Sequence, residues 1–415
     1  MPMQRPLPVL IPLLVIAFAL VGSTPARAQV LGPMGGLPGV QIPGVGMPGV
    51  PPVTSMPRVD DLLRATRAIT RQLQINALLR EEPTRVAVDP HGDPVLRGEF
   101  LALDLTPAQL DALQAQGFAA DRRTPADATL GLDLVVLRDT RGRSEAKAMR
   151  ALQQAVPNAA FTYQHLYLPA GDAGAVGDNT SATPPSAAMP LRVGLIDGGV
   201  NPADPALARA RIDDHGCSKA TVSRHGTAVA ARLVDGDPDT LYAADLWCGD
   251  KVGGATSNLV DALAWMARER VPVINISLVG PDNPVLAHAV QAMIARGHVL
   301  VAAVGNDGPA APPLFPASYP GVIGVSAVDA HDRVLPESGS GNQVAFCASG
   351  VVGHGRDALR GTSFASPIVA RRAAQLLDAP RQGAAAQVEQ RLVGEARDLG
   401  PPGRDPRYGY GLLLP

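Results

Sequence analysis

Four polar residues in the second half of the chain have the types and places that acyl-transfer chemistry requires. Asp197 ends an apolar strand, where its carboxylate can accept a hydrogen bond from an imidazole N–H. His225 opens a segment of small residues, and Asn306 follows a buried apolar run, where its amide could donate to a developing oxyanion. Ser363 begins a helix, so we expect its hydroxyl to project into solvent and its backbone N–H to point outward.

Each of these residues also has an ordinary structural explanation when it is taken alone. The aspartate can begin a turn, the histidine can cap a helix or fill the core, and the asparagine can occupy a left-handed turn. A helix cap explains Thr362 and Ser363 in the run Gly-Thr-Ser-Phe-Ala-Ser-Pro at 361–367. It does not explain why Gly361, Ala365 and Pro367 stand at these positions in the run. The four polar residues must therefore be weighed together.

The four residues follow one another in the order Asp, His, Asn, Ser, which resembles the order in the subtilisin-like serine proteases, or subtilases. Residues 191–415 resemble the catalytic domain of that family. The Gly-Thr-Ser-x-Ala-x-Pro match at 361–367 is its most specific part, because five positions are fixed. A further match, to the family's substrate-binding strand, comprises Ser277, Leu278, Val279 and Gly280.

The resemblance implies a role for each residue. Ser363 attacks the scissile carbonyl, His225 removes its proton and returns it to the leaving amine, and Asp197 orients the imidazole. Asn306 and the Ser363 N–H stabilise the oxyanion. A protein or peptide substrate pairs in extended form with residues 277–280 by strand addition. The predicted function is therefore that of an exported serine endopeptidase acting through an acyl-enzyme.

Two positions depart from the family pattern. Gly198 stands where relatives usually carry Ser or Thr, and Ala228 stands where a second His is common. These departures keep open a catalytically impaired subtilase-like binding module. A sedolisin-type peptidase is a second alternative, but that family uses Glu in place of the histidine, and His225 argues against it.

The pattern of residues 191–415 predicts an α/β fold in which a parallel sheet lies between two layers of helices. Unalternated apolar runs separated by helical segments are typical of strands that are buried on both faces. The expected strands are Leu191–Ile196, Leu241–Leu246, Val271–Ser277, Val299–Val304 and Val322–Val328. The expected helices are His225–Val234, Ser257–Arg270, Asn283–Arg296 and Ser363–Leu377.

Residues 59–168 predict a smaller α+β domain. After a helix at Val59–Leu79, the elements follow the order β-α-β-β-α-β, which is ferredoxin-like. The subtilase resemblance implies that this domain is a propeptide, a partner that assists folding and inhibits the enzyme. Self-cleavage is then expected between about Leu166 and Gly174. A permanent N-terminal domain is the alternative.

The remaining segments are expected to lie outside the folded domains. Residues 1–28 resemble a secretory signal peptide, with Arg5, a short apolar stretch and the cleavage site Ala26-Arg27-Ala28. Residues 29–58 form a spacer with Pro-Gly-Val repeats, and residues 169–190 form a linker. The mature protein is therefore expected in the periplasm or outside the cell, without a membrane anchor.

Composition limits the other partners. A net charge of −2 and 4% aromatic residues argue against a nucleic-acid surface. No cofactor is expected, with calcium as the open alternative: Asp235, Asp237 and Asp239 have a calcium-like spacing, but the Gly and Glu of a calcium loop are missing, which favours a solvated loop. The group Asp213, Asp214, His215 and Cys217 matches no standard zinc motif.

Two further questions stay open at the level of sequence. Cys217 and Cys248 either form a disulfide, which leaves Cys347 buried, or all three cysteines are free. The apolar residues Leu278, Val279 and Val304 favour an uncharged substrate residue at P1, the residue that donates the scissile carbonyl.

Overall fold

The computed structural model describes residues 71–122, 128–170, 190–218, 221–353, 355 and 358–415. The expected signal peptide, the spacer, the start of the first helix and the linker residues 171–189 lie outside this range. Within the described part of the chain, no helix has the length and apolar character needed to cross a membrane.

Residues 71–170, called here the N-terminal domain, begin with α2 (Arg71–Glu81). The ferredoxin-like elements then follow as β2 (Pro94–Leu103), α3 (Pro107–Ala115), β3 (Phe118–Arg122), β4 (Leu134–Asp139), α5 (Glu145–Ala155) and β5 (Phe161–His165). These strands pair antiparallel in the order β5-β2-β4-β3. This is the ferredoxin-like order that the sequence predicts. A short strand, β1 (Val86–Val88), was not expected and pairs with the start of β2.

Local sequence signals explain why α3 begins where it does. The Thr106 side chain accepts a hydrogen bond from the Gln109 N–H, and the Gln109 side chain accepts one from the Thr106 N–H. This reciprocal capping box, with Pro107 at the first helical position, confirms the predicted helix start.

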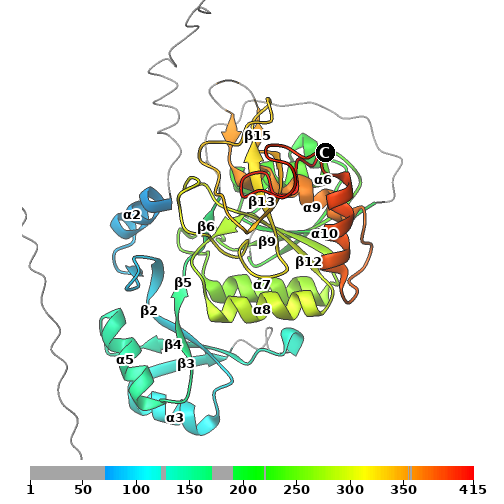
Figure 1. The fold of residues 1–415 in the computed structure, drawn as a ribbon. Helices are drawn as coiled ribbons and strands as arrows, with labels where there is room; N and C mark the ends of the chain where they lie inside the picture. The colour runs from blue at the N-terminus through cyan, green and yellow to red at the C-terminus, as the bar shows by residue number, and fades with distance from the viewer. Residues whose placement is uncertain (1–70, 123–127, 171–189, 219–220, 354, 356–357) are drawn as a thin grey trace, which may run out of the picture. The chain divides into compact units, whose positions relative to one another are not determined.

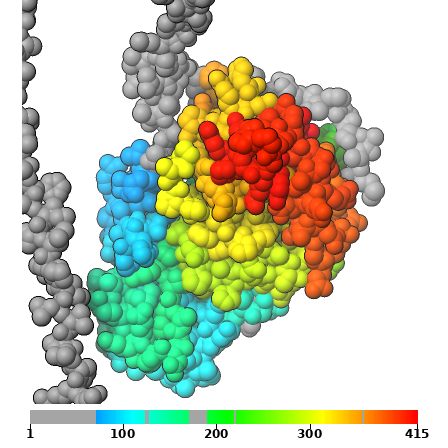
Figure 2. Space-filling view, viewed as in Figure 1, coloured from blue at the N-terminus to red at the C-terminus, as the bar shows by residue number. Residues whose placement is uncertain are grey.

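The two faces of the N-terminal sheet bury different partners. One face packs on α3 and α5 through a cluster that includes Phe100, Leu113 and Leu152. The other face contributes Leu101, Leu134 and Val136 to a cluster shared with the C-terminal domain. Figure 2 shows the blue-to-teal surface of the N-terminal domain lying directly against the yellow-green surface of the C-terminal domain. The N-terminal domain is therefore docked on the larger one through apolar side chains.

The C-terminal domain, residues 190–415, is built on a seven-stranded parallel sheet in the order β14-β13-β12-β10-β7-β9-β8. Its strands are β7 (Arg192–Asp197), β8 (Arg211–His215), β9 (Thr240–Asp245), β10 (Val273–Ile276), β12 (Val299–Ala303), β13 (Ile323–Val328) and β14 (Val344–Ser349). Its α-helices are α6 (Arg224–Val234), α7 (Thr256–Arg268), α8 (Pro284–Ala295), α9 (Ser366–Ala374) and α10 (Ala384–Glu395).

These helices cover the sheet on both sides (Figure 1). One apolar cluster contains residues of α6, α9 and α10, and the other contains residues of α7 and α8. The predicted three-layer α/β fold is thus confirmed. The helix expected at Ser363–Leu377 is wrong in detail, because residues 362–364 form a separate 3₁₀ turn before α9 begins.

Candidate active site

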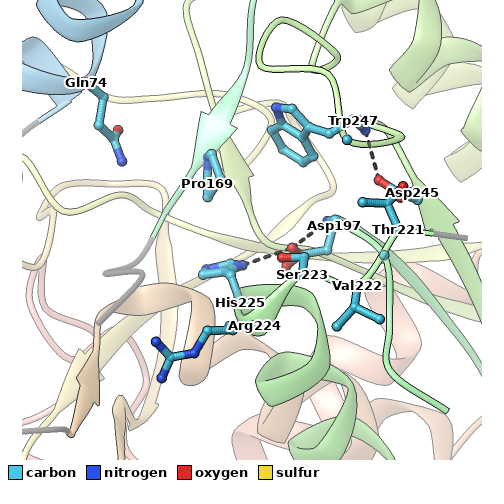
Figure 3. Close-up of a pocket in the computed structure, with 13 residues that line it drawn as sticks. Gln74, Pro169, Asp197, Thr221, Val222, Ser223, Arg224, His225, Asp245 and Trp247 are labelled. Carbon is cyan, nitrogen blue, oxygen red and sulfur yellow. Dashed lines mark hydrogen bonds and ion pairs between the residues drawn. The ribbon is translucent and has the colours of Figure 1, made fainter. Parts of the chain in front are cut away.

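The carboxylate of Asp197 and the imidazole of His225 form a buried pair. Asp197 ends β7, and its Oδ1 lies 2.9 Å from Nδ1 of His225, the second residue of α6. The two side chains are 1% and 5% exposed, and Figure 3 shows the ring directed at the carboxylate. Because the aspartate accepts this bond, Nδ1 carries the proton and the other ring nitrogen, Nε2, is left as a base.

Close packing of α6 on the turn after β7 sets this geometry. A Cβ added at Gly226 would lie 2.2 Å from the carbonyl oxygen of Gly198. The side chain of Ser223 caps the helix by accepting a bond from the Gly226 N–H. The absence of a side chain at Gly226 is therefore what permits this close approach. Gly198, a departure from the family pattern, is equally constrained, since a Cβ there would lie 2.7 Å from that of Ser223.

Ser363 lies in the 3₁₀ turn and is fully buried, so the expectation of a solvent-facing hydroxyl is wrong. Its hydroxyl donates to the carbonyl of Ser277 at 3.2 Å. Its backbone N–H donates to the carbonyl of Ala170 at 3.0 Å. Nε2 of His225 has no hydrogen-bond partner among the described residues. The serine is therefore covered by the end of the N-terminal domain.

Asn306 is oriented by the residue that precedes the serine. Its Oδ1 accepts bonds from both the backbone N–H and the hydroxyl of Thr362, at 3.0 and 3.2 Å. The same hydroxyl accepts a bond from the N–H of Gly305. With Oδ1 held in this way, the amide nitrogen of Asn306 is the end of the side chain that remains to act as a donor.

The predicted substrate-binding residues are occupied by the chain itself. Strand β11 (Leu278–Val279) pairs antiparallel with β6 (Leu168–Pro169), in the register Leu278 with Pro169 and Val279 with Leu168. The Ala170 N–H extends this pairing by donating to the Ser277 carbonyl at 3.1 Å. Pro169 was expected to begin a linker, and it instead belongs to a strand because β11 offers unpaired backbone groups.

A cavity of about 440 Å³ lies beside the Asp197–His225 pair. Pro169 stands at this cavity, and Trp247 forms another part of its lining (Figure 3). Asp245 also lines it and was not singled out from the sequence. Its place at the end of β9, in register with Asp197, was the signal that could have found it. Its Oδ1 accepts bonds from the N–H groups of Trp247 and Cys248.

The expected solvated loop at Asp237 and Asp239 is wrong. Both carboxylates are buried and pair with the guanidinium of Arg371 on α9. The Asp239–Arg371 contact is 2.6 Å, and Asp239 also accepts a bond from the N–H of Leu191. A side-chain cation thus already balances the charge that a calcium ion would have balanced.

The second group of candidate metal ligands does not assemble. His215 stacks on Trp265, with ring centroids 4.6 Å apart, and Cys217 forms a disulfide with Cys248. Cys347 is free and buried, and burial raises the pKa of its thiol to about 12. The described residues bring together one set of three residues with metal-binding atoms, Cys217, Asp245 and Cys248, but its two sulfurs are joined to each other.

Comparisons with known proteins agree with this arrangement. The sequence model of the subtilase family matches residues 191–411, more than half of the chain. Subtilisin DY from Bacillus licheniformis is 34% identical over 209 residues, which cover 46% of this chain and 75% of that protein. Minor extracellular protease Epr from Bacillus subtilis (strain 168) is 28% identical over 249 residues, covering 54% of this chain but 37% of Epr.

A solved structure extends the similarity of fold. Fervidolysin from Fervidobacterium pennivorans, described as a keratinolytic enzyme related to subtilisin, superimposes with a TM-score of 0.62 at 18% identity. The match covers 79% of this chain and 61% of fervidolysin. The chain therefore spans less than two thirds of both Epr and fervidolysin. With the family match and the similarity to subtilisin DY, these findings place the chain in the subtilase family, the family of subtilisin-like serine peptidases.

Proposed function

We propose that this chain is an exported serine endopeptidase that hydrolyses peptide bonds through Asp197, His225 and Ser363. One observation carries the proposal most directly. The carbonyl of Ala170 is bound by the Ser363 N–H, in a strand pairing that presents an extended peptide to the serine. This contact supports the proposal, because the mechanism requires a scissile carbonyl to bind the Ser363 N–H.

The chemistry begins with the hydroxyl of Ser363. When it turns from the Ser277 carbonyl, its oxygen can attack the bound carbonyl carbon while Nε2 of His225 accepts the proton. The Asp197 carboxylate stabilises the resulting imidazolium through Nδ1–H. The C–N bond then breaks, and His225 returns the proton to the departing amine, which leaves an acyl-enzyme.

Water completes the cycle. His225 takes a proton from the attacking water, the ester bond to Ser363 breaks, and the same proton returns to the serine oxygen. In both halves the negative oxygen is stabilised by the Ser363 N–H and by the amide nitrogen of Asn306, whose orientation Thr362 sets. The buried position of the site strengthens these interactions, because less water competes for them.

We infer that the first substrate is the chain itself. The carbonyl in the site belongs to Ala170, so the bond presented for cleavage is Ala170–Gly171, inside the interval expected from the sequence. The N-terminal domain then acts as an inhibitory propeptide while its last residues remain in the site. Export is supported by the signal-like residues 1–28 and by the similarity to Epr, a protein described as a minor extracellular protease.

The alternative of an impaired binding module rests on one specific observation. The Oδ2 of Asp197 is buried and has no hydrogen-bond partner among the described residues, and the neighbouring Gly198 offers no hydroxyl. The endopeptidase proposal requires that the hydrogen bond from His225 to Oδ1, which also accepts a bond from the Gly198 N–H, suffices to hold the imidazole. A sedolisin-type mechanism would need a glutamate where His225 lies.

A fluorophosphonate probe, which labels an activated serine, tests the proposal. The processed wild-type protein should be labelled, and Ser363→Ala should not be. Ser340→Ala is the matched control, because this serine bonds the distant Pro406 carbonyl and its loss should leave labelling intact. Folded, processed protein that takes up no probe would support the binding module instead.

A further inference from the structure

The segment in the site lies in a defined frame, which allows its residues to be assigned to subsites. The N–H of Tyr167 donates to the Gly254 carbonyl at 2.7 Å, and the N–H of Ala170 donates to the Ser277 carbonyl. Ala170, whose carbonyl meets Ser363, therefore stands at P1. Tyr167, three residues earlier, stands at P4.

The P1 side chain is buried among apolar residues. Ala170 is 2% exposed and packs in a cluster with Val279, Ala303 and Leu314. Leu314 and Val279 border the same space, since a Cβ added at Gly305 would lie 2.7 Å from Cδ1 of Leu314 and 3.6 Å from Cγ1 of Val279. Val279 packs from the strand on which the substrate pairs. A methyl group is surrounded on these sides, and a larger side chain would displace Leu314 or Val279.

The P4 side chain lies in a site shaped for a ring with a hydroxyl. Tyr167 is fully buried, and its hydroxyl donates to the carbonyl of Pro281 at 2.8 Å. Burial raises the pKa of this phenol, so it stays a neutral donor. The ring lies against Gly280, where an added Cβ would come within 2.5 Å of it. The absence of a side chain at Gly280 is therefore what makes room for the ring.

We propose that this site selects alanine at P1 and tyrosine at P4, so that its substrates carry the pattern Tyr-x-x-Ala. Val279 and Leu314 limit the size of the P1 residue, and Gly280 and the Pro281 carbonyl recognise the P4 residue. The proposal rests on the endopeptidase function above and names the substrate class for it.

Peptides that differ at one position test the P1 preference and the P4 preference separately. With the processed protein, kcat/KM for acetyl-Tyr-Leu-Pro-Ala-aminocoumarin should exceed that for the Phe P1 analogue and for the Ala P4 analogue by at least about tenfold each. Equal or reversed rates for the P1 pair overturn the assignment of P1, and equal rates for the P4 pair overturn that of P4.

Matched variants assign the effect to the named residues. Leu314→Ala should raise the ratio of Phe to Ala cleavage at P1 at least about tenfold. Leu392→Ala, in the core of α10, should leave that ratio unchanged. Gly280→Ala, made together with Tyr167→Ala so that the propeptide still fits, should abolish the preference for tyrosine at P4. Gly394→Ala is its control, because a Cβ there meets nothing within 4 Å.

A measurement without catalysis separates this proposal from the proposed function. In the uncleaved Ser363→Ala chain, Ala170→Phe should lower the midpoint of thermal unfolding, and adding Leu314→Ala should restore part of it. An unchanged midpoint for Ala170→Phe means that the pocket has spare room and overturns the P1 assignment. If Leu314→Ala restores the midpoint but the fluorophosphonate probe does not label Ser363 in the wild-type protein, the proposed activity is overturned and the P1 assignment stands.

Discussion

The carbonyl oxygen of Ala170 accepts a 3.0 Å hydrogen bond from the backbone N–H of Ser363, 193 residues further along the chain (363 − 170 = 193). The same alanine donates to the carbonyl of Ser277, so both of its backbone polar groups are satisfied inside the site. The N-terminal domain therefore enters the candidate active site in the manner of a substrate. Ala170 must therefore leave before another peptide can pair with Ser277 and Ser363 in the same way.

Self-cleavage is the most direct consequence. The wild-type chain should yield a fragment that begins at Gly171, and Ser363→Ala should remain joined at that bond. Intact-mass analysis and N-terminal sequencing of the purified proteins measure both. If Ser363→Ala is trimmed to the same N-terminus, another protease makes the cut and self-processing is excluded.

The N-terminal domain should also stabilise helix α7. The N-cap residue of α7 is Ala255, which has no side chain to bond the free N–H groups. Gln164 of the N-terminal domain supplies the acceptor: its Oε1 binds the Ser257 N–H at 3.1 Å, and its Nε2 binds the Ser257 hydroxyl. A missing cap of this kind costs about 1 kcal/mol, which is roughly a five- to tenfold change in affinity.

Gln164→Leu should therefore weaken inhibition by the N-terminal domain roughly five- to tenfold. The inhibition constant of the purified domain against the processed enzyme measures this effect. Gln153→Leu, at an exposed position of α5, is the control and should inhibit like the wild type. Equal inhibition by Gln164→Leu would show that α7 does not need this cap.

A pH dependence follows from Asp89 in the N-terminal domain. Burial alone would raise the pKa of this carboxyl, but bonds from His165 and from the N–H groups of Asp93 and His91 outweigh it, and the pKa is lowered. A lowered pKa stabilises the fold at pH values above the unfolded value of 3.8, and this contribution disappears as pH falls through the native value.

In the uncleaved Ser363→Ala chain, Asp89→Asn should therefore be less stable at pH 7 by about 1–2 kcal/mol. The difference should shrink as the pH falls below 3.8. Urea unfolding at several pH values gives this difference directly. A difference that stays constant down to pH 2 would mean that the carboxylate charge contributes nothing.

How much of this could be predicted from the sequence depends on where each signal lies. The strands β7, β9, β10, β12 and β13 are continuous apolar runs, and the predicted sheet contained all five. The two edge strands were missed: β8 because Arg211–His215 has no apolar pattern, and β14 although Val344–Ser349 is mostly buried. The resemblance implied an inhibitory propeptide cleaved between about Leu166 and Gly174, but it did not identify Ala170 as the residue whose carbonyl meets Ser363, because this contact joins distant segments that only the folded chain brings together.

The ion pairs of Arg371 lead to a prediction about metals and stability. Arg371 is buried between Asp237 and Asp239, so its removal leaves two buried carboxylates without a counter-charge. Arg371→Met should destabilise the protein by about 3–5 kcal/mol.

Because the arginine already balances these charges, a chelator should leave the unfolding midpoint of the wild type unchanged. A fall in the midpoint with EDTA, reversed by calcium, would contradict this and require a calcium site elsewhere.

Gly226 provides the sharpest test of how the fold positions His225. The residue lies in α6, where alanine is ordinarily preferred to glycine by about 1 kcal/mol. Its Cβ would, however, meet the Gly198 carbonyl at 2.2 Å, so α6 must move away from the turn that carries Asp197. A displacement of about 1 Å in a catalytic group can reduce the rate about 100-fold. Gly226→Ala should therefore lower kcat by about that factor while the protein still folds.

Gly394→Ala in α10, where the added Cβ has open space, should keep the wild-type rate. Rates and circular dichroism of both variants decide the matter, and a fully active Gly226→Ala would mean that this contact does not position the histidine.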